Sequence, residues 1–378
     1  LEEAQARIRR RLEKREDSFL GMVERDIFGC AHSPYRKLLE LAGCEMGDVR
    51  RLVAGEGIEG TLTSLHDAGV YVTFDEFKGK KEAVRGSQRL SFRAGDFDNP
   101  NLVPEAELET GGSRGDGSVV RVSLPLVEDM AVNMAASQDA QGIANHTHAV
   151  WTLSSGGLCM LRLAKLGTPP VAWFYPMKPL PRRLKAAYWS VTVLSRPLGT
   201  RLPLPRLLHM QEPERMARWL GDHGRRGRPV AGICYATSAV RVCTVAAAMG
   251  ISLDHVCVVT LGEPYTEAKD AAVRAAGARA TVRYGLSESG LISDSCGNPD
   301  CPDDMHLFTG CFALIQRPRE VGPGGVTVQA FAFTSLLASA PKIFLNFDTG
   351  DYGVLKRRRC GCALESLGLV DHISHIRS

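Results

Sequence analysis

The stretch 282-VRYGLSESG-290 decides how the rest of the sequence is interpreted. Apolar and polar residues alternate up to Tyr284, which predicts a short half-buried strand, and Gly285 ends that strand. A hydroxyl and a carboxylate follow at Ser287 and Glu288. These side chains suit a nucleotide, since a ring stacks on a base, a hydroxyl contacts a phosphate oxygen and a carboxylate binds Mg²⁺. A strand that ends in glycine and serine is more often a plain turn, so two further stretches are needed to decide.

A glycine-rich loop, 110-TGGSRGDGS-118, precedes the apolar alternation of 119-VVRVSL-124. Its glycines let backbone N–H groups turn toward an anion, and its hydroxyls add donors, so the loop predicts a phosphate cradle. No Gly-Lys-Ser/Thr follows, which excludes a P-loop, and a flexible hairpin loop is the alternative. The phosphate contacts are assigned to Thr110, Gly111, Gly112, Ser113 and Gly115.

A third stretch, 347-FDTGDYG-353, follows the strand-like run 343-IFLNF-347 and places Asp351 between glycines. A carboxylate at this position can accept hydrogen bonds from two ribose hydroxyls. The alternative is that Asp351 is a plain turn residue, because aspartate beside glycine is common in turns.

In this order, the three stretches resemble the signatures of the adenylate-forming enzymes, which include acyl-CoA and aryl-CoA ligases, peptide-synthetase adenylation domains and luciferases. TGGSRG resembles the family's pyrophosphate loop, YGLSES its Tyr-Gly-x-Thr/Ser-Glu signature, and FDTGD its Tyr-Arg-Thr-Gly-Asp signature. The resemblance covers most of residues 30 to 378. The most similar branch is that of phenylacetate–CoA ligase and the acyl-protein synthetases, on the basis of 33-SPYRKLLELAG-43, 262-GEP-264 and a cysteine pair near the end.

The resemblance implies a two-step reaction that uses ATP and Mg²⁺. A small carboxylic acid attacks the α-phosphate to give an acyl-adenylate, and a thiol, of CoA or of an acyl carrier protein, then displaces AMP. Glu288 is implied to bind Mg²⁺ and Ser287 the α-phosphate. The adenine and ribose contacts are assigned to Gly262, Glu263, Pro264, Tyr284, Gly285 and Asp351. An amide-forming ligase and a non-catalytic nucleotide- or acyl-binding module stay open as alternatives.

Strands and helices alternate in the middle of the sequence, which predicts the α/β class. Runs of β-branched and apolar residues at 230–235, 256–261 and 280–285 are separated by alanine-rich helical segments, so a parallel sheet covered by helices is expected. Ligands bind beyond the carboxyl ends of such strands, where both GEP and YGLSES fall. The resemblance implies the large N-terminal domain of an adenylate-forming enzyme, with a small β subdomain near the C-terminus.

The expected organisation is a large adenylation domain at 1–368. It comprises a helical N-terminal part (1–105), an α/β core (106–290) and a small β part with a zinc knuckle (291–368). Residues 369–378 are expected to be the stub of a hinge. In the resembled family a small C-terminal domain brings a catalytic lysine and part of the thiol tunnel, and neither is in this sequence. The chain alone is therefore expected to bind ATP and to adenylate slowly.

The stretch from Asn145 to Gly157 supplies candidates for the acyl pocket. His146 and His148 would lie on different faces of a helix, and no cysteine or carboxylate is spaced to complete a metal site with them. In the resembled branch, a histidine- and aromatic-bearing segment followed by a Gly-Gly pair lines this pocket, and aromatic side chains favour an aryl or medium-length acyl group. The pocket residues are assigned as His148, Trp151, Gly157 and Tyr235.

Two close cysteine pairs lie in turn-like stretches, 295-SCGNPDCP-302 and 359-RCGC-362. Two such pairs can supply four thiolates to a tetrahedral Zn²⁺, and His306 can replace one of them; free thiols in loops are the alternative. A site with four protein ligands has no open position, so the zinc is expected to be structural. The assigned ligands are Cys296, Cys301, Cys360 and Cys362.

The composition is that of an ordinary globular enzyme. The formal net charge of +4 over 378 residues gives no reason to expect a nucleic-acid partner. No run of eighteen apolar residues and no signal peptide is found, so no membrane partner is expected and the default location is cytoplasmic. Eleven cysteines, an odd number, do not suggest a disulfide framework. A homodimer is a possibility that the sequence leaves open.

Overall fold

The structure is a computed structural model. It describes residues 1–109, 119–152, 156–175, 186, 189–190, 192–193, 195–196, 201–286, 288–322 and 324–378. The phosphate-loop candidates Thr110 to Gly115, together with Ser287, lie outside the described residues, so their predicted roles stay predictions.

The N-terminal part is mostly helical. Its helices are α1 (Glu2–Glu13), α2 (Arg15–Met22), a π-helical turn (Val23–Phe28), α3 (Pro34–Leu41), α4 (Met46–Asp67) and α5 (Phe74–Phe77). The short strands β1 (Val72–Thr73), β2 (Ala83–Arg85) and β3 (Gln88–Leu90) and a 3₁₀ turn (Ala94–Phe97) accompany them. Helix α3 begins at Pro34, since proline suits the first helical turn.

The central part alternates strands and helices, as predicted. A hairpin of β4 (Ala106–Glu109) and β5 (Val119–Val122) leads into α6 (Leu124–Ala140). The following elements are β6 (Thr147–Trp151), α7 (Gly156–Lys165), β7 (Ala172–Tyr175), β8 (Pro205–Leu207), α9 (Pro213–Arg225), β9 (Val230–Tyr235), α10 (Ala236–Ala248), β10 (Val256–Leu261), α11 (Glu267–Arg274) and β11 (Arg279–Leu286). Strands β9, β10 and β11 are parallel, so their carboxyl ends share one edge of the sheet.

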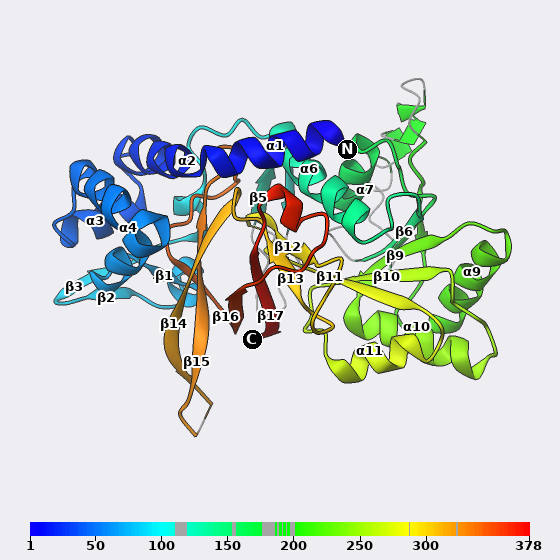
Figure 1. Ribbon diagram of the computed structural model, residues 1–378. Coiled ribbons are helices and arrows are strands. Elements are labelled where there is room, and N and C mark those ends of the chain that lie inside the picture. The colour runs from blue at the N-terminus through cyan, green and yellow to red at the C-terminus, as the bar shows by residue number, and fades with distance from the viewer. Residues whose placement is uncertain are drawn as a thin grey trace.

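The C-terminal part consists of antiparallel strands. These are β12 (Gly290–Ser295), β13 (Met305–Leu307), β14 (Phe312–Val321), β15 (Val326–Ser335), β16 (Phe347–Arg357) and β17 (Asp371–Arg377), with a 3₁₀ turn (Glu365–Leu367) before the last. Among the described residues, one large sheet has thirteen strands (Figure 1). Its order is β14-β15-β16-β17-β13-β12-β11-β10-β9-β6-β7-β8, with β1 paired to β16.

Helices cover both faces of the parallel half of this sheet, which confirms the expected α/β class. Side chains from α9, α10 and α11 pack on one face, against residues such as Ala149 and Val258. Side chains from α6 and α7 pack on the other face, against Val150 and Ile233. No helix in the described part of the chain is long and apolar enough to cross a membrane.

Two expected boundaries differ from the structure. Residues 343–346, expected to extend the strand before Asp351, are outside β16, because Asn346 has a left-handed backbone with φ 53° and β16 begins at Phe347. Residues 369–378, expected to be a hinge stub, contain β17, which pairs with β16 and β13 inside the large sheet. The sheet also continues across position 290, since β11 pairs with β12.

Candidate functional site

The predicted nucleotide motifs begin at the carboxyl edge of β9, β10 and β11. Gly262 directly follows β10 and has φ +74°, a conformation that L side chains rarely adopt. A Cβ at this position would lie 3.1 Å from the ring of Tyr235, at the end of β9. The aromatic ring therefore packs on the bare glycine backbone, and a larger residue at position 262 would displace it.

The Glu263 carboxylate, expected on the adenine side, holds the start of α10. Its Oε2 accepts hydrogen bonds from the backbone N–H and the hydroxyl of Thr237, both at 2.6 Å. These donors belong to the first turn of α10, where backbone N–H groups have no partner inside the helix. Pro264, the next residue, accepts at its carbonyl from Lys269 Nζ at 2.5 Å. The GEP segment thus fixes α10 and α11 relative to the sheet edge.

The structure brings together the residues predicted for adenine and ribose. Tyr284 Oη donates to Asp351 Oδ2 at 2.7 Å, and Ser378 Oγ donates to Asp351 Oδ1 at 2.5 Å. The Tyr284 ring also lies 5.9 Å from the Phe333 ring. An ionised carboxylate offers about four acceptor positions, which is the chemistry that hydroxyls of a ligand require.

Gly285 lets β11 and β12 approach closely beside this pair. The pairing shifts register between Tyr284 and Gly285, and a Cβ at Gly285 would lie 2.5 Å from the carbonyl oxygen of Gly290. No side chain fits there. The chain bends at the resulting bulge and continues into the turn that contains Glu288.

Glu288, the predicted Mg²⁺ ligand, forms an ion pair with Lys78. Lys78 Nζ lies 3.3 Å from Glu288 Oε1, and the two side chains are 12% and 13% exposed. Lys78 directly follows α5, whose capping box joins Thr73 and Glu76. The ring of Phe77 in α5 lies 5.2 Å from that of Phe347, so α5 places Lys78 near the start of β16.

Sequence reasoning did not assign a role to Lys78. The only local signal is a basic residue immediately after the capped helix 74–77, and such residues are usually solvated. Its partner lies 210 residues further along the chain. Only the fold shows that this cation faces the acidic residue of the YGLSES motif.

Asp348 departs from the arginine of the resembled FDTGD signature, and the structure shows its partner. Arg319 of β14 donates to Asp348 Oδ1 at 2.9 Å and to the carbonyl oxygen of Gly350 at 2.6 Å. The guanidinium therefore braces the backbone just before Asp351. A positive charge is present beside the motif, but it comes from β14, two strands away from β16 in the sheet.

The four expected pocket residues do not line one surface. Trp151 and Ala149 face α9 and α10, whereas His148 faces α6 and lies 2.9 Å from Gln138 Nε2 through its Nε2. The correction follows from strand geometry, because alternate residues of β6 point to opposite faces of the sheet. Burial, assisted by Arg283 and His146, lowers the pKa of His148 to about 4, so this imidazole is neutral at pH 7.

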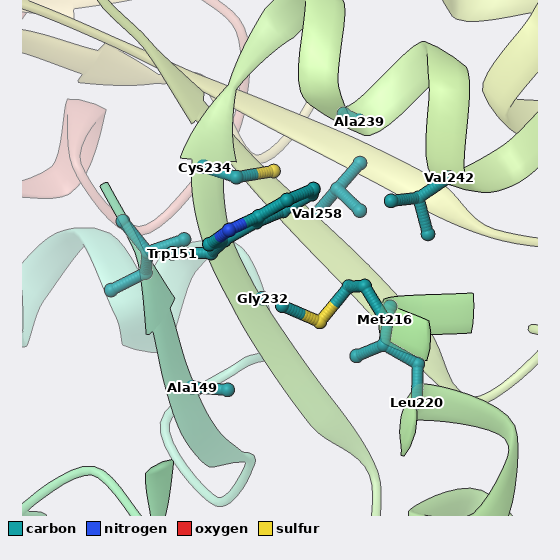
Figure 2. A pocket seen from close by; sticks show the side chains of 10 residues that line it. Ala149, Trp151, Met216, Leu220, Gly232, Cys234, Ala239, Val242 and Val258 are labelled. Carbon is teal, nitrogen blue, oxygen red and sulfur yellow. The ribbon is translucent and has the colours of Figure 1, made fainter. Parts of the chain in front are cut away.

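A small apolar cavity lies between the sheet and helices α9 and α10 (Figure 2). Its volume is about 20 Å³, little more than the space for one water-sized group. Trp151 lines it, while His148, Gly157 and Tyr235 do not. The other lining side chains are apolar and include Met216, Leu220, Ala239, Val242 and Cys234. Burial raises the pKa of the Cys234 thiol, so that thiol is neutral and behaves as an apolar group.

Three of the four predicted zinc ligands lie together with His306. Ligand atoms of Cys296, His306, Cys360 and Cys362 are all within 4.8 Å of one another. His306 Nε2 is 3.1 Å from Cys362 Sγ and 3.5 Å from Cys360 Sγ. Cys301 is outside this group, because it lies on the far side of the knuckle with Asp303 and His375. His306, which the sequence offered as a replacement for one cysteine, thus stands in this group in place of Cys301.

The donor chemistry of this cluster fits Zn²⁺. His306 Nδ1 lies 2.8 Å from the carbonyl oxygen of Leu369, to which it donates, so Nε2 carries a free lone pair toward the sulfur atoms. A hydrogen bond to its sulfur from Cys296 holds the pKa of Cys362 far below its usual range. Three cysteines and one histidine are a common ligand set of closed structural zinc sites.

Neighbouring charges support this group of cysteines and histidine. The Asp304 carboxylate is fully buried and accepts from Arg358 Nη2 and, at 2.8 Å, from His372 Nδ1. Burial opposes ionisation, but the His372 hydrogen bond and these charges lower the pKa of Asp304 to about 2. The ring of His372 lies 4.0 Å from that of His306. Strand β17 therefore contacts His306 through the tilted ring of His372, which Asp304 holds.

The sequence matches no protein-family model and no curated protein. Solved structures share the fold. One is a 2-hydroxyisobutyryl-CoA ligase in complex with 2-HIB-AMP and CoA in the thioesterification state, with TM-score 0.52 and 13% identity, covering 99% of this chain and 67% of that chain. The same ligase in the postadenylation state with R3-HIB-AMP gives TM-score 0.51 and 13% identity, covering 97% and 65%. The resemblance to adenylate-forming enzymes is thus confirmed for the fold, and the chain spans about two thirds of that ligase.

Proposed function

We propose that this chain, which has the fold of an acyl-CoA ligase, activates a carboxylic acid with ATP to form an acyl-adenylate. The observation that carries the proposal is the contact between Tyr284 and Asp351 at the carboxyl edge of the parallel strands, 2.7 Å apart. Glu288 follows the same strand within four residues of Tyr284 and has a cation at hand in Lys78. A ring, an acceptor for hydroxyls and a carboxylate are the groups that a base, a ribose and Mg²⁺ require.

In the first step, a carboxylate oxygen of the acid attacks the α-phosphorus of ATP, and pyrophosphate leaves with the bonding electron pair. Asp351 would orient the ribose, and Tyr284 would pack beside the base. Glu288 would hold Mg²⁺, which neutralises phosphate charge when bound. The protein's contribution is positioning and electrostatic stabilisation, not covalent chemistry.

In the second step, a thiol displaces AMP from the acyl-adenylate. The sulfur forms a bond to the acyl carbon, AMP leaves with its oxygen, and the thiol proton passes to solvent. CoA and an acyl carrier protein are the proposed thiol donors. An amine in place of the thiol would give an amide, and offering the three acceptors in turn separates these outcomes.

The apolar cavity behind the carboxyl edge is proposed to receive the tail of the acid. Trp151 and Cys234, at or next to the ends of β6 and β9, form the part of its wall nearest the edge where the nucleotide motifs lie. With about 20 Å³ of space and apolar walls, it suits a short aliphatic group better than an aryl ring. The two aromatic side chains that favoured an aryl acid in the sequence do not both line it.

A structural zinc ion is proposed for Cys296, His306, Cys360 and Cys362. The cluster joins the knuckle after β12 to the turn after β16, two segments that no regular element connects. Binding energy released there would be folding energy, because the ligands come together only in the folded chain. Four protein ligands leave no coordination position for a substrate, so the ion takes no part in the reaction.

The function is tested by exchange of labelled pyrophosphate into ATP, with a panel of carboxylic acids of increasing tail length. Acid-dependent exchange supports the proposal, and a short aliphatic acid is expected to be the best substrate. The second candidate is a nucleotide-binding module without turnover, favoured by Asp348 in place of the arginine of the resembled signature. Calorimetric binding of ATP without any acid-dependent exchange would favour that module.

A further inference from the structure

Cys301, which does not join the four-residue cluster, lies in a second group of ligand-type side chains. Ligand atoms of Cys301, Asp303 and His375 are all within 4.8 Å of one another. Cys301 Sγ and Asp303 Oδ1 are 3.6 Å apart. With Zn–S near 2.3 Å and Zn–O near 2.0–2.2 Å, two ligands of one tetrahedral ion lie roughly 3.5 Å apart, so this spacing needs little adjustment.

Within the described part of the chain, one carboxylate oxygen of Asp303 has no hydrogen-bond partner. Its side chain is buried, with the residue 5% exposed, and its Oδ2 has no hydrogen-bond partner. The nearest cation, Arg377 Nη1, is 3.8 Å from Oδ2, beyond hydrogen-bonding distance. A buried carboxylate oxygen without a partner is costly and is rare in folded proteins, so this oxygen indicates a missing ligand atom or ion.

His375 supplies a nitrogen from the opposite side. Its Nδ1 lies 3.1 Å from Ser374 Oγ, which leaves Nε2 for a metal. The side chain is exposed, so an ion can enter from solvent on this side. Cys301 is half-buried, and Asp303 is the buried member of the group.

We propose that Cys301, Asp303 and His375 bind a second divalent transition-metal ion, of the zinc class. A thiolate and an imidazole select such an ion over Mg²⁺ or Ca²⁺, which prefer oxygen ligands. Three protein ligands leave one tetrahedral position for water or another small ligand. This site is therefore open, whereas the cluster around His306 is closed.

The segment 296–304 between β12 and β13, called the knuckle here, contributes different side chains to the two sites. Cys296 and Asp304 face His306 and His372, while Cys301 and Asp303 face His375. An ion at the second site would tie the knuckle to β17 near its end. Ser378, just beyond β17, donates to Asp351, so the same ion would steady the segment that contacts the proposed ribose ligand.

The test is a count of zinc per chain. The whole chain, purified without chelator, is equilibrated with Zn²⁺, separated from unbound metal and analysed by plasma mass spectrometry. His375→Ala and Cys301→Ser are each expected to bind about one ion fewer than the unchanged chain. A site with only three protein ligands loses most of its metal affinity when any one of them is removed. The fold should tolerate His375→Ala, since the side chain is exposed. His32→Ala, another exposed histidine, is the control and should bind as many ions as the unchanged chain.

A second readout uses Co²⁺, whose absorption reports its ligands. The Cys301→Ser chain loaded with Co²⁺ should lack a weak thiolate absorption band that the unchanged chain shows. The strong band of the three-cysteine site should remain in both chains. Equal zinc counts in the unchanged chain, His375→Ala and Cys301→Ser would overturn the proposal. The result is read as a difference between chains, so it does not depend on what the cluster around His306 holds, nor on adenylation.

Discussion

Lys78 and Glu288 face each other across the start of the proposed nucleotide site, with Nζ 3.3 Å from Oε1. Both side chains are largely buried, so neither charge is stabilised by bulk water. In the metal-free chain, the ammonium group therefore compensates the carboxylate that is proposed to bind Mg²⁺. The Lys78 ammonium group and Mg²⁺ cannot both lie close to the same Glu288 oxygen unless the side chains rearrange.

Glu288→Gln is expected to keep the fold and to lower Mg²⁺-dependent pyrophosphate exchange by on the order of a hundredfold, because a charge that positions the metal is lost. Exchange rates are measured at several Mg²⁺ concentrations. Glu267→Gln, an exposed carboxylate in the first turn of α11, serves as the control and should exchange at the normal rate. Unchanged exchange in Glu288→Gln would remove Glu288 from the mechanism.

Lys78→Met is expected to lower the free energy of unfolding of the metal-free chain by about 1–3 kcal/mol, since a buried carboxylate loses its charged partner. Added Mg²⁺ should recover part of that loss, because the ion takes the place of the ammonium group. Thermal unfolding with and without Mg²⁺ measures both effects. Lys81→Met, at an exposed position of the same segment, should change neither curve. Equal loss in both variants would mean that the ion pair has no special role.

Cys360→Ser is expected to release the proposed structural zinc and to lower the melting temperature, because metal binding is coupled to folding. Elemental analysis and thermal unfolding of the same preparation are the measurements. Cys30→Ser is the matched control, since Cys30 is half-buried and outside the cluster. No zinc in unchanged protein prepared without chelator would end this assignment.

His148 should make stability fall in mild acid. Its folded-state pKa of about 4 is below the ordinary 6.5, so the unfolded chain binds the proton more readily between these values. Its contribution is therefore complete above pH 6.5 and is lost as the pH falls toward 4, at about 1.4 kcal/mol per pH unit. Denaturant unfolding of His148→Gln, which keeps a group able to bond Gln138, should show a shallower slope in this window. The same slope in both chains would contradict the assignment.

Gly232→Ala should restrict the range of carboxylic acids that the protein accepts as substrates. A Cβ at Gly232 would lie 3.8 Å from the Leu220 side chain, an ordinary contact, so the methyl group fits and occupies the cavity. We expect stability to rise by about 0.4–1 kcal/mol and longer acids to lose kcat/KM relative to shorter ones. Gly55→Ala, in α4 with open space around it, is the control that should alter stability alone. An unchanged acid profile in Gly232→Ala would show that the acid binds elsewhere.

The parallel half of the fold could be predicted because its signals are local. The apolar runs 230–235 and 256–261 are strands by composition. Glu288 and Asp351 were also identified locally, through the motifs that contain them. These features depend on short stretches of chain that behave alike in most folds.

The remaining site features depend on contacts between distant segments. The sequence offered His306 as a replacement for one cysteine, but only the fold places its imidazole 3.1 Å from Cys362 Sγ and leaves Cys301 outside the cluster. His148 and Trp151 separate onto opposite faces because they lie in a strand, where alternate side chains point apart. The partner of Glu288 was likewise not apparent, since Lys78 lies in another part of the chain.

The strand β1 has a consequence for how this protein is made. It pairs with β16, and Asn346 just before β16 bonds the carbonyl oxygen of Val70, 276 residues earlier in the chain. At ~5–20 residues per second, a ribosome needs roughly 15–55 s to synthesise the intervening chain. During that time Leu62 and Phe77 lack the contacts that the β16 region later supplies, although other N-terminal residues of the same apolar cluster, such as Phe97, are already made. The N-terminal helices are therefore expected to bind a chaperone during synthesis, and slow translation near β16 would prolong that exposure.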